Sequence, residues 1–336
     1  MSCGAVELLR DEGSRRAVAA TTWAVTGLGT RGSSAPGSEA PSRQHAGSGP
    51  CSYVFRSAPC AAPQGGPVPY TTVNRVELFH EDRGSGQPLI LLHGWGTNGQ
   101  VWSAQAEEFA GAYRVVVPDW RGCGRSARPG GGDTIAGHAQ DVLALAEALE
   151  LDRPVLVGVS AGAAIVLEAA RRAPSSVRGV VAVDGPGYWP AERKAELLVE
   201  LRRMLRTDRA ATVRQWVVDW YGPLADPALP EWTVQQILAA SDSIDEILSD
   251  AVRHNPRETI GELEVPAFFV HGRLDAEIPA EVSETLAELA PHGEAHIMAE
   301  SGHMPHVEQP AEFNALLHSI LGRLAAPDAA RDALQD

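Results

Sequence analysis

The segment from Val155 to Leu167 constrains the fold more than any other part of this chain. It is an apolar run rich in β-branched residues, followed by a Gly-x-Ser-x-Gly motif centred on Ser160 and then by helix-forming residues. A strand that turns directly into a helix needs small residues beside the turn, and Gly158 and Gly162 leave room for a strained serine. The motif therefore predicts either a serine nucleophile lifted out of a sheet or a tight strand-to-helix turn with a serine near the helix start.

The composition and charge of the 336 residues exclude several classes of function. The formal net charge of −15 opposes binding to phosphate backbones, so we expect no nucleic-acid partner. No apolar stretch reaches the roughly 18 to 20 residues that a membrane-spanning helix needs, so we expect a soluble protein with no membrane partner. Cys51 and Cys60 lie in a low-complexity region, so we expect reduced cysteines and a cytoplasmic location. The four cysteines form no CxxC pair and have no metal-ligand spacing with histidine, so no metal is predicted.

Composition also divides the chain into segments. Residues 1–70 are rich in Ala, Gly, Ser, Pro and Arg, and we expect them to be disordered because they cannot bury enough apolar area to offset the entropy of ordering. Ser14-Arg15-Arg16 before a mildly apolar segment is a weak form of a twin-arginine export signal, which leaves export as an alternative location. We predict a core at 71–186 and 259–326, a helical lid at 187–258 and a C-terminal tail at 327–336.

Strand patterns alternate with helical patterns through the core. Several of the strand patterns are continuous β-branched runs, which are typical of a mostly parallel sheet covered by helices on both faces. The expected strands are 73–81, 88–92, 114–117, 155–159, 177–183, 265–272 and 295–298.

The segment 187–258 breaks this alternation because it carries helical patterns only. It holds several large aromatic residues, and we expect Trp189, Trp216 and Trp220 to line a substrate pocket beneath a lid. The alternative is a helical layer whose aromatic residues belong only to the core.

Polar residues that catalysis can use follow the carboxyl ends of several expected strands. Ser160, Asp184, Asp275 and His303 all lie at such positions, where ligands collect in open parallel sheets. A serine hydroxyl needs a general base to become a nucleophile, and the base needs an acid to orient it. We therefore expect Ser160 and His303 to converge with Asp275, and Asp184 is the alternative acid.

Five motifs in this order resemble the α/β-hydrolase superfamily over residues 73–324. They are His93-Gly94-Trp95, the glycine-rich loop 118–126, the motif around Ser160, Gly272-Arg273-Leu274-Asp275 and Ser301-Gly302-His303. The resemblance implies an α/β fold with a mostly parallel eight-stranded sheet, helices on both faces and a helical lid insertion.

The resemblance also implies roles for single residues. Ser160 would be the nucleophile, His303 the base and Asp275 the acid, with Asp184 as the alternative acid. The backbone N–H groups of Trp95 and Ala161 would form an oxyanion hole, and the Trp95 side chain would wall the pocket. His93 and Asp119 would support the surrounding loops.

These residues predict a hydrolase that acts on an ester-type bond of a small to medium apolar or aromatic substrate through an acyl-enzyme. We expect no cofactor, and the sequence does not indicate which oligomeric state the protein adopts. One alternative is cofactor-free oxygen chemistry, as in perhydrolases with haloperoxidase activity or quinolone-type dioxygenases. Another is a hydrolase-fold ligand receptor without catalysis.

Overall fold

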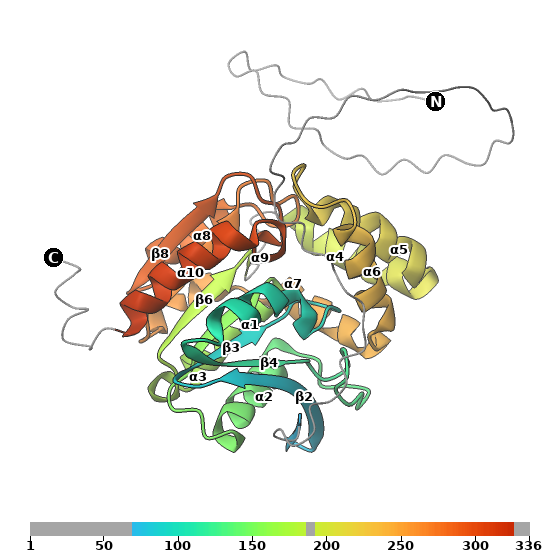
Figure 1. The fold of residues 1–336 in the computed structure, drawn as a ribbon. Coiled ribbons are helices and arrows are strands. Elements are labelled where there is room, and N and C mark those ends of the chain that lie inside the picture. Colours follow the sequence, from blue (N-terminus) through green and yellow to red (C-terminus); the bar gives the residue numbers. More distant parts are fainter. Residues whose placement is uncertain (1–68, 186–191, 326–336) are drawn as a thin grey trace, which may run out of the picture. The chain divides into compact units, whose positions relative to one another are not determined.

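The computed structural model describes residues 69–185 and 192–325 (Figure 1). The predictions made for 1–68, for Trp189 and for the tail 327–336 lie outside the described residues. Among the described residues, no helix is both long enough and apolar enough to span a membrane.

Eight strands form one sheet in the order β1-β2-β4-β3-β5-β6-β7-β8. The pairs β1/β2 and β2/β4 are antiparallel, and all other pairs are parallel, which confirms the mostly parallel sheet expected from the sequence. Every residue of β5 and β6 is buried, because helices cover both faces of the central strands. The strands are Tyr70–Val73, Val76–Gly84, Gln87–Leu92, Tyr113–Pro118, Val155–Val159, Gly179–Val183, Ala267–Gly272 and Gly293–Met298.

The first predicted strand, 73–81, is wrong in one respect. The chain reverses at Asn74 and Arg75, which both have positive φ, so β1 and β2 form a hairpin that begins at Tyr70. Two successive positive φ values are the geometry of a tight hairpin turn, for which Asn is a common residue and Arg is not. Asn74 is therefore a residue that favours a turn, but Arg75 is not, so the turn was not predicted.

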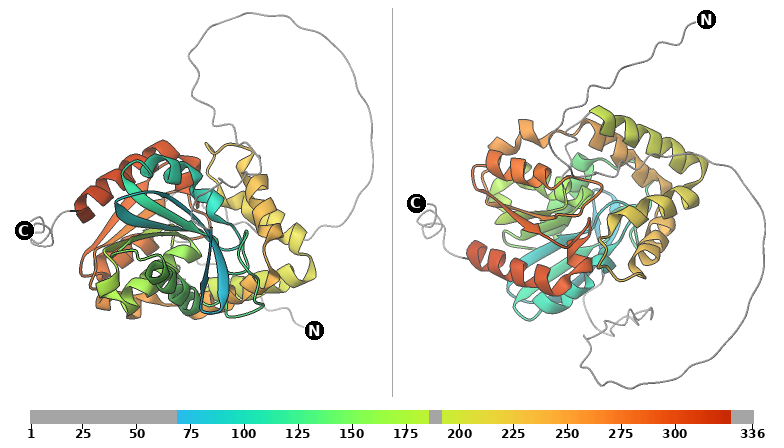
Figure 2. Two further views of the ribbon diagram at one scale, coloured as in Figure 1. Left: turned by 60° about the horizontal axis from the view of Figure 1, so that its bottom comes forward. Right: turned by 90° about the horizontal axis from the view of Figure 1, so that it is seen from above.

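Helices pack on both faces of the sheet. α1 and α10 lie together on one face, and α2 and α3 lie together on the other (Figure 2). The 3-10 turn η1 (Gly99–Trp102) precedes α1, and η2 (Pro174–Ser176) follows α3. The helices of the core are α1 Ser103–Phe109, α2 Ile135–Ala148, α3 Ala161–Arg172, α8 Glu281–Leu289, α9 Pro305–Glu308 and α10 Pro310–Ala325.

A set of helices between β6 and β7, here called the helical insertion, interrupts the core (Figure 1). It contains no strand among the described residues, as the sequence pattern predicts. Its elements are α4 Glu192–Thr207, α5 Arg209–Val217, η3 Val218–Trp220, α6 Leu229–Ala239, η4 Asp242–Asp245, α7 Glu246–Arg253, η5 Pro256–Glu258 and η6 Ile260–Glu262.

Candidate active site

Ser160 occupies the turn between β5 and α3 with φ 55° and ψ −121°. A side chain on either flanking glycine would clash with backbone: a Cβ on Gly158 would lie 2.2 Å from the Gly162 carbonyl oxygen, and one on Gly162 would lie 2.5 Å from the His93 carbonyl oxygen. The Ser160 N–H donates to the Val183 carbonyl at 2.8 Å, which ties the turn to the neighbouring strand. The two glycines thus permit a conformation that costs a non-glycine residue about 1–3 kcal/mol.

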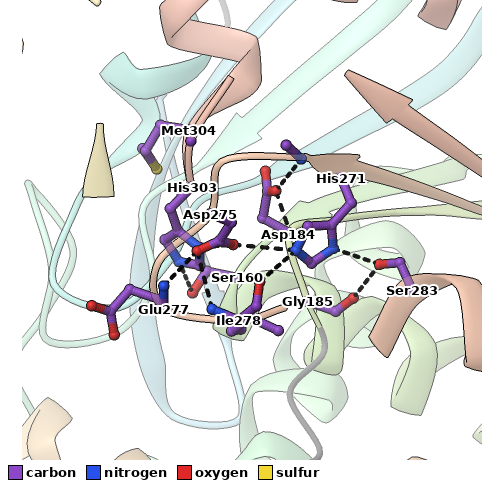
Figure 3. A network of polar contacts seen from close by, with 12 residues as sticks. Ser160, Asp184, Gly185, His271, Asp275, Glu277, Ile278, Ser283, His303 and Met304 are labelled. Carbon is purple, nitrogen blue, oxygen red and sulfur yellow. Dashed lines mark hydrogen bonds and ion pairs between the residues drawn. The ribbon is translucent and has the colours of Figure 1, made fainter. Parts of the chain in front are cut away.

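A chain of hydrogen bonds runs from Ser160 into the protein (Figure 3). His303 Nε2 lies 3.0 Å from Ser160 Oγ, and His303 Nδ1 lies 2.7 Å from Asp275 Oδ2. The other carboxylate oxygen, Asp275 Oδ1, accepts the N–H groups of Glu277 at 2.7 Å and Ile278 at 3.0 Å. Because Asp275 accepts from Nδ1, the tautomer of His303 is fixed with Nε2 free to accept a proton.

The carboxylate bonded to His303 is therefore that of Asp275, while Asp184 takes a different position. Asp184 Oδ1 accepts the Gly272 N–H at 2.8 Å and lies 3.7 Å from His271 Nε2. Burial alone would raise the pKa of Asp275, but His303 and His271 beside it hold that pKa below its ordinary value. Burial raises the pKa of Asp184 well above its ordinary value despite the attraction of His271. The pKa values of the two acids are thus shifted in opposite directions, and Asp275 is ionised at neutral pH.

His93 fixes the loop that passes beside Ser160. Its Nδ1 donates to the Gly94 carbonyl at 2.8 Å, and its Nε2 accepts the Trp120 N–H at 3.0 Å. The Thr97 hydroxyl also donates to the Gly94 carbonyl, at 3.1 Å. Burial lowers the pKa of His93 to about 4, so the ring stays neutral and keeps both bonds at neutral pH.

This bracing also orients the Trp95 N–H. In a planar trans peptide the N–H points away from the carbonyl, so the Trp95 N–H points away from the groups that hold the Gly94 carbonyl. A Cβ on Gly94 would lie 3.3 Å from the Ser160 Cβ, which places this peptide directly against the serine. The N–H of Ala161, the first residue of α3, has no acceptor within its own helix.

Asp119 and Cys123 belong to the loop after β4 and lie away from the hydrogen-bond chain. Asp119 accepts the Gly99 N–H at 2.8 Å and the Arg125 N–H at 2.9 Å, so it joins two loops. Cys123 is fully buried, and burial raises the pKa of its thiol. A protonated, inaccessible thiol is not a nucleophile.

A pocket opens above Ser160 between the core and the helical insertion. Its empty volume is about 650 Å³, including the open mouth, and its walls are mostly apolar. Trp95, Trp216 and Trp220 all line it. The ring centroid of Trp216 lies 5.1 Å from that of Trp95 and 5.4 Å from that of Trp220. The Trp220 ring also packs edge-on against His303 at 5.5 Å. Among the described residues that line the pocket, Glu277 is the acidic one.

Glu308 connects the helical insertion to the loop that carries His303. Its Oε2 accepts the N–H groups of Gly222 at 2.8 Å and Gly302 at 3.1 Å, and its Oε1 accepts the Met304 N–H at 3.1 Å. The His303 N–H donates to a carbonyl of the insertion as well. Glu308 was not predicted as a site residue, because nothing in its local sequence shows that a carboxylate at 308 reaches a glycine 86 residues earlier.

Replacing Glu308 with glutamine is expected to lower the free energy of unfolding by about 1–3 kcal/mol, because at least one of these N–H groups then faces the amide NH2 group and loses its acceptor. Urea denaturation at pH 7 measures the change. Glu312→Gln, on the exposed side of α10, is the matched control and should unfold like the wild type. Equal stability of the Glu308 and Glu312 variants would contradict this stabilising role of Glu308.

Three side chains next to the hydrogen-bond chain also have the composition of a metal site. Asp184, His271 and Asp275 offer ligand-type atoms that lie within 4.8 Å of one another. However, His271 Nε2 lies 2.9 Å from the Ile278 carbonyl oxygen, an acceptor that requires a proton on this nitrogen. A metal ligand must offer a lone pair there, so the residues present fit a hydrogen-bonded ion network better than a cation site.

Comparison with known proteins agrees with this geometry. A model of the alpha/beta hydrolase family matches residues 89–316. The chain is 30% identical over 266 residues to a pimeloyl-[acyl-carrier protein] methyl ester esterase of Aliivibrio fischeri, covering 74% of this chain and 99% of the relative. It is 31% identical over 268 residues to a 2-hydroxymuconate semialdehyde hydrolase of a Pseudomonas species, covering 73% and 90%.

A solved structure shares the fold of this chain. An esterase from Exiguobacterium antarcticum superposes with a TM-score of 0.71 at 22% identity, covering 75% of this chain and 98% of that one. The family match spans the sheet from β3 onward, the strand-to-helix turn at Ser160 and the His303 loop. The chain belongs to the alpha/beta hydrolase family.

Proposed function

We propose that this protein hydrolyses an ester bond of a small to medium apolar or aromatic substrate through an acyl-enzyme on Ser160. The observation that carries the proposal is the hydrogen-bond chain from Asp275 through His303 to a serine that opens into an apolar pocket. The esterases among its relatives support ester cleavage.

The geometry supports a defined sequence of steps. Ser160 Oγ attacks the carbonyl carbon while His303 Nε2, 3.0 Å away, takes its proton. The carboxylate of Asp275 stabilises the resulting imidazolium, and His303 then gives the proton to the leaving alcohol. Water, deprotonated by His303, attacks the acyl carbon, and collapse of the second tetrahedral intermediate releases the acid and returns the proton to Ser160.

The N–H groups of Trp95 and Ala161 act as the oxyanion hole in this scheme. Both belong to residues that line the pocket with Ser160, and Ala161 opens a helix whose positive dipole end favours negative charge. A donor of this kind contributes about 2.7–4 kcal/mol to stabilising an acyl-transfer transition state. The bracing by His93 and Thr97 keeps the Trp95 N–H oriented before substrate arrives.

The pocket supports the substrate class. Tryptophan and aliphatic side chains form most of its walls, so apolar acyl or alcohol groups gain most from burial there. The helical insertion supplies Trp216 and Trp220, which supports its role as a lid over the substrate.

A fluorophosphonate probe and a panel of p-nitrophenyl esters test this proposal on the full chain. We expect stoichiometric labelling of Ser160, located by peptide mass spectrometry, and turnover that is lost in proportion to labelling. Labelling without turnover of any ester, lactone or thioester would favour a ligand receptor instead. Failure to label Ser160 would overturn the proposal.

A further inference from the structure

A second imidazole lies directly behind the acid of the hydrogen-bond chain. His271, in β7, is fully buried, and its Nε2 faces three acceptors (Figure 3). These are the Ile278 carbonyl oxygen at 2.9 Å, Asp275 Oδ2 at 3.3 Å and Asp184 Oδ1 at 3.7 Å. Since each of these atoms accepts, Nε2 must carry a proton.

The other ring nitrogen contacts a hydroxyl group that can accept a hydrogen bond from it. His271 Nδ1 lies 2.7 Å from Ser283 Oγ, and the Ser283 hydroxyl donates to the Gly185 carbonyl at 3.3 Å. A hydroxyl has one proton, so when it donates to Gly185 it accepts from Nδ1. With the hydroxyl proton directed to Gly185, both ring nitrogens carry protons, and this arrangement makes His271 a cation.

The charges around His271 agree with this assignment. Burial alone would lower the pKa of His271, but Asp184 and Asp275 together raise it above its ordinary value. Two carboxyl groups that share one buried site do not both ionise easily. The surroundings shift the pKa values of these two in opposite directions. Burial raises the pKa of Asp184, and the charges of Asp275 and Glu308 raise it further, whereas His303 and His271 hold the pKa of Asp275 below its ordinary value, so Asp275 is the more readily ionised of the two.

We propose that His271 is a protonated positioning residue that holds the carboxylate of Asp275 and limits how strongly His303 binds a proton. Its effect on the rate rests on the proposed function, whereas its protonation state does not. The cation attracts Asp275 from one side while His303 bonds the same oxygen from the other, so the two imidazoles compete for one carboxylate oxygen.

The sign of the effect follows from this competition. The acidic limb of kcat/KM reports protonation of the free enzyme's base, which is His303 here. The positive charge of His271 disfavours a second positive charge on His303, so removing it makes His303 easier to protonate. His271→Gln should therefore move the acidic limb to higher pH, by about two pH units at an effective dielectric constant of about 20, because both imidazoles contact Asp275 Oδ2.

The experiment measures pH profiles of ester hydrolysis for the wild type and two glutamine variants. His80→Gln is the matched control, because His80 is also buried but lies in β2 and bonds Thr71. We expect the limb to move upward in His271→Gln and to stay in place in His80→Gln. An unchanged limb in a folded His271→Gln would overturn the proposal, because loss of packing alone lowers the rate without moving the limb.

Nitrogen-15 NMR of the wild-type histidines tests the protonation state without any variant having to fold. We expect one imidazole to show two protonated nitrogens from pH 6 to 8, and Ser283→Ala should perturb that ring selectively. Absence of such a ring would overturn the proposal, even if Ser160 is labelled and esters are hydrolysed. A protein inactivated by a chelator and restored by a divalent cation would also overturn it, in favour of a metal held by Asp184, His271 and Asp275.

Discussion

Ser160→Ala is expected to lower kcat for ester hydrolysis by roughly six orders of magnitude, because a nucleophile and base that act as a unit lose nearly all their effect together. His303 has no hydroxyl to deprotonate in this variant, and an acyl-enzyme cannot form. Single-turnover and steady-state assays with p-nitrophenyl acetate measure the loss. The oxyanion donors remain, so a small rate above that in buffer should persist.

Ser103→Ala is the control for this result. Ser103 lies at the exposed start of α1, where its hydroxyl donates to the Gln100 carbonyl, and its loss should leave the rate unchanged. A Ser160→Ala rate within tenfold of the wild type would refute the acyl-enzyme mechanism. Hydrolysis would then have to use a water molecule activated by His303 directly.

The sequence predicted those features of the site that depend on local chemistry. The turn at Ser160 was predictable because clashes at Gly158 and Gly162 are set by residues within a few positions or by the adjoining strand β3. The convergence of Ser160, Asp275 and His303 was predictable because parallel strands bring their carboxyl ends to the same edge. The parallel part of the sheet followed from the buried β-branched runs.

Long-range contacts between side chains could not be predicted in this way. Asp184 and Asp275 follow neighbouring strands, in which Val183 pairs with Val270, so spacing along the chain gave no decisive choice between them. The choice depends on side-chain direction: the N–H groups of Glu277 and Ile278 hold the carboxylate of Asp275 toward His303. His271 was not predicted as a site residue, since inside β7 it looks like an ordinary core position.

Asp275→Asn is expected to lower kcat by about four orders of magnitude, the effect of reversing a histidine tautomer in a triad of this kind. The N–H groups of Glu277 and Ile278 would keep the amide oxygen in the place of Oδ1, so the amide nitrogen would face His303. An amide N–H donates to Nδ1 and forces the proton of the ring onto Nε2, which then has no lone pair for the Ser160 hydroxyl. Steady-state kinetics with p-nitrophenyl acetate, with circular dichroism to check folding, measure the effect.

Asp184→Asn is the matched control, and its rate should stay within tenfold of the wild type. Its amide oxygen can still accept the Gly272 N–H, and the neutral amide replaces a carboxyl group whose pKa is already raised by burial. The reverse outcome, an active Asp275 variant and an inactive Asp184 variant, would transfer the role of acid to Asp184. Loss of activity in both variants with folding intact would show that the two acids act through His271 as one coupled group, so that neither aspartate alone orients His303.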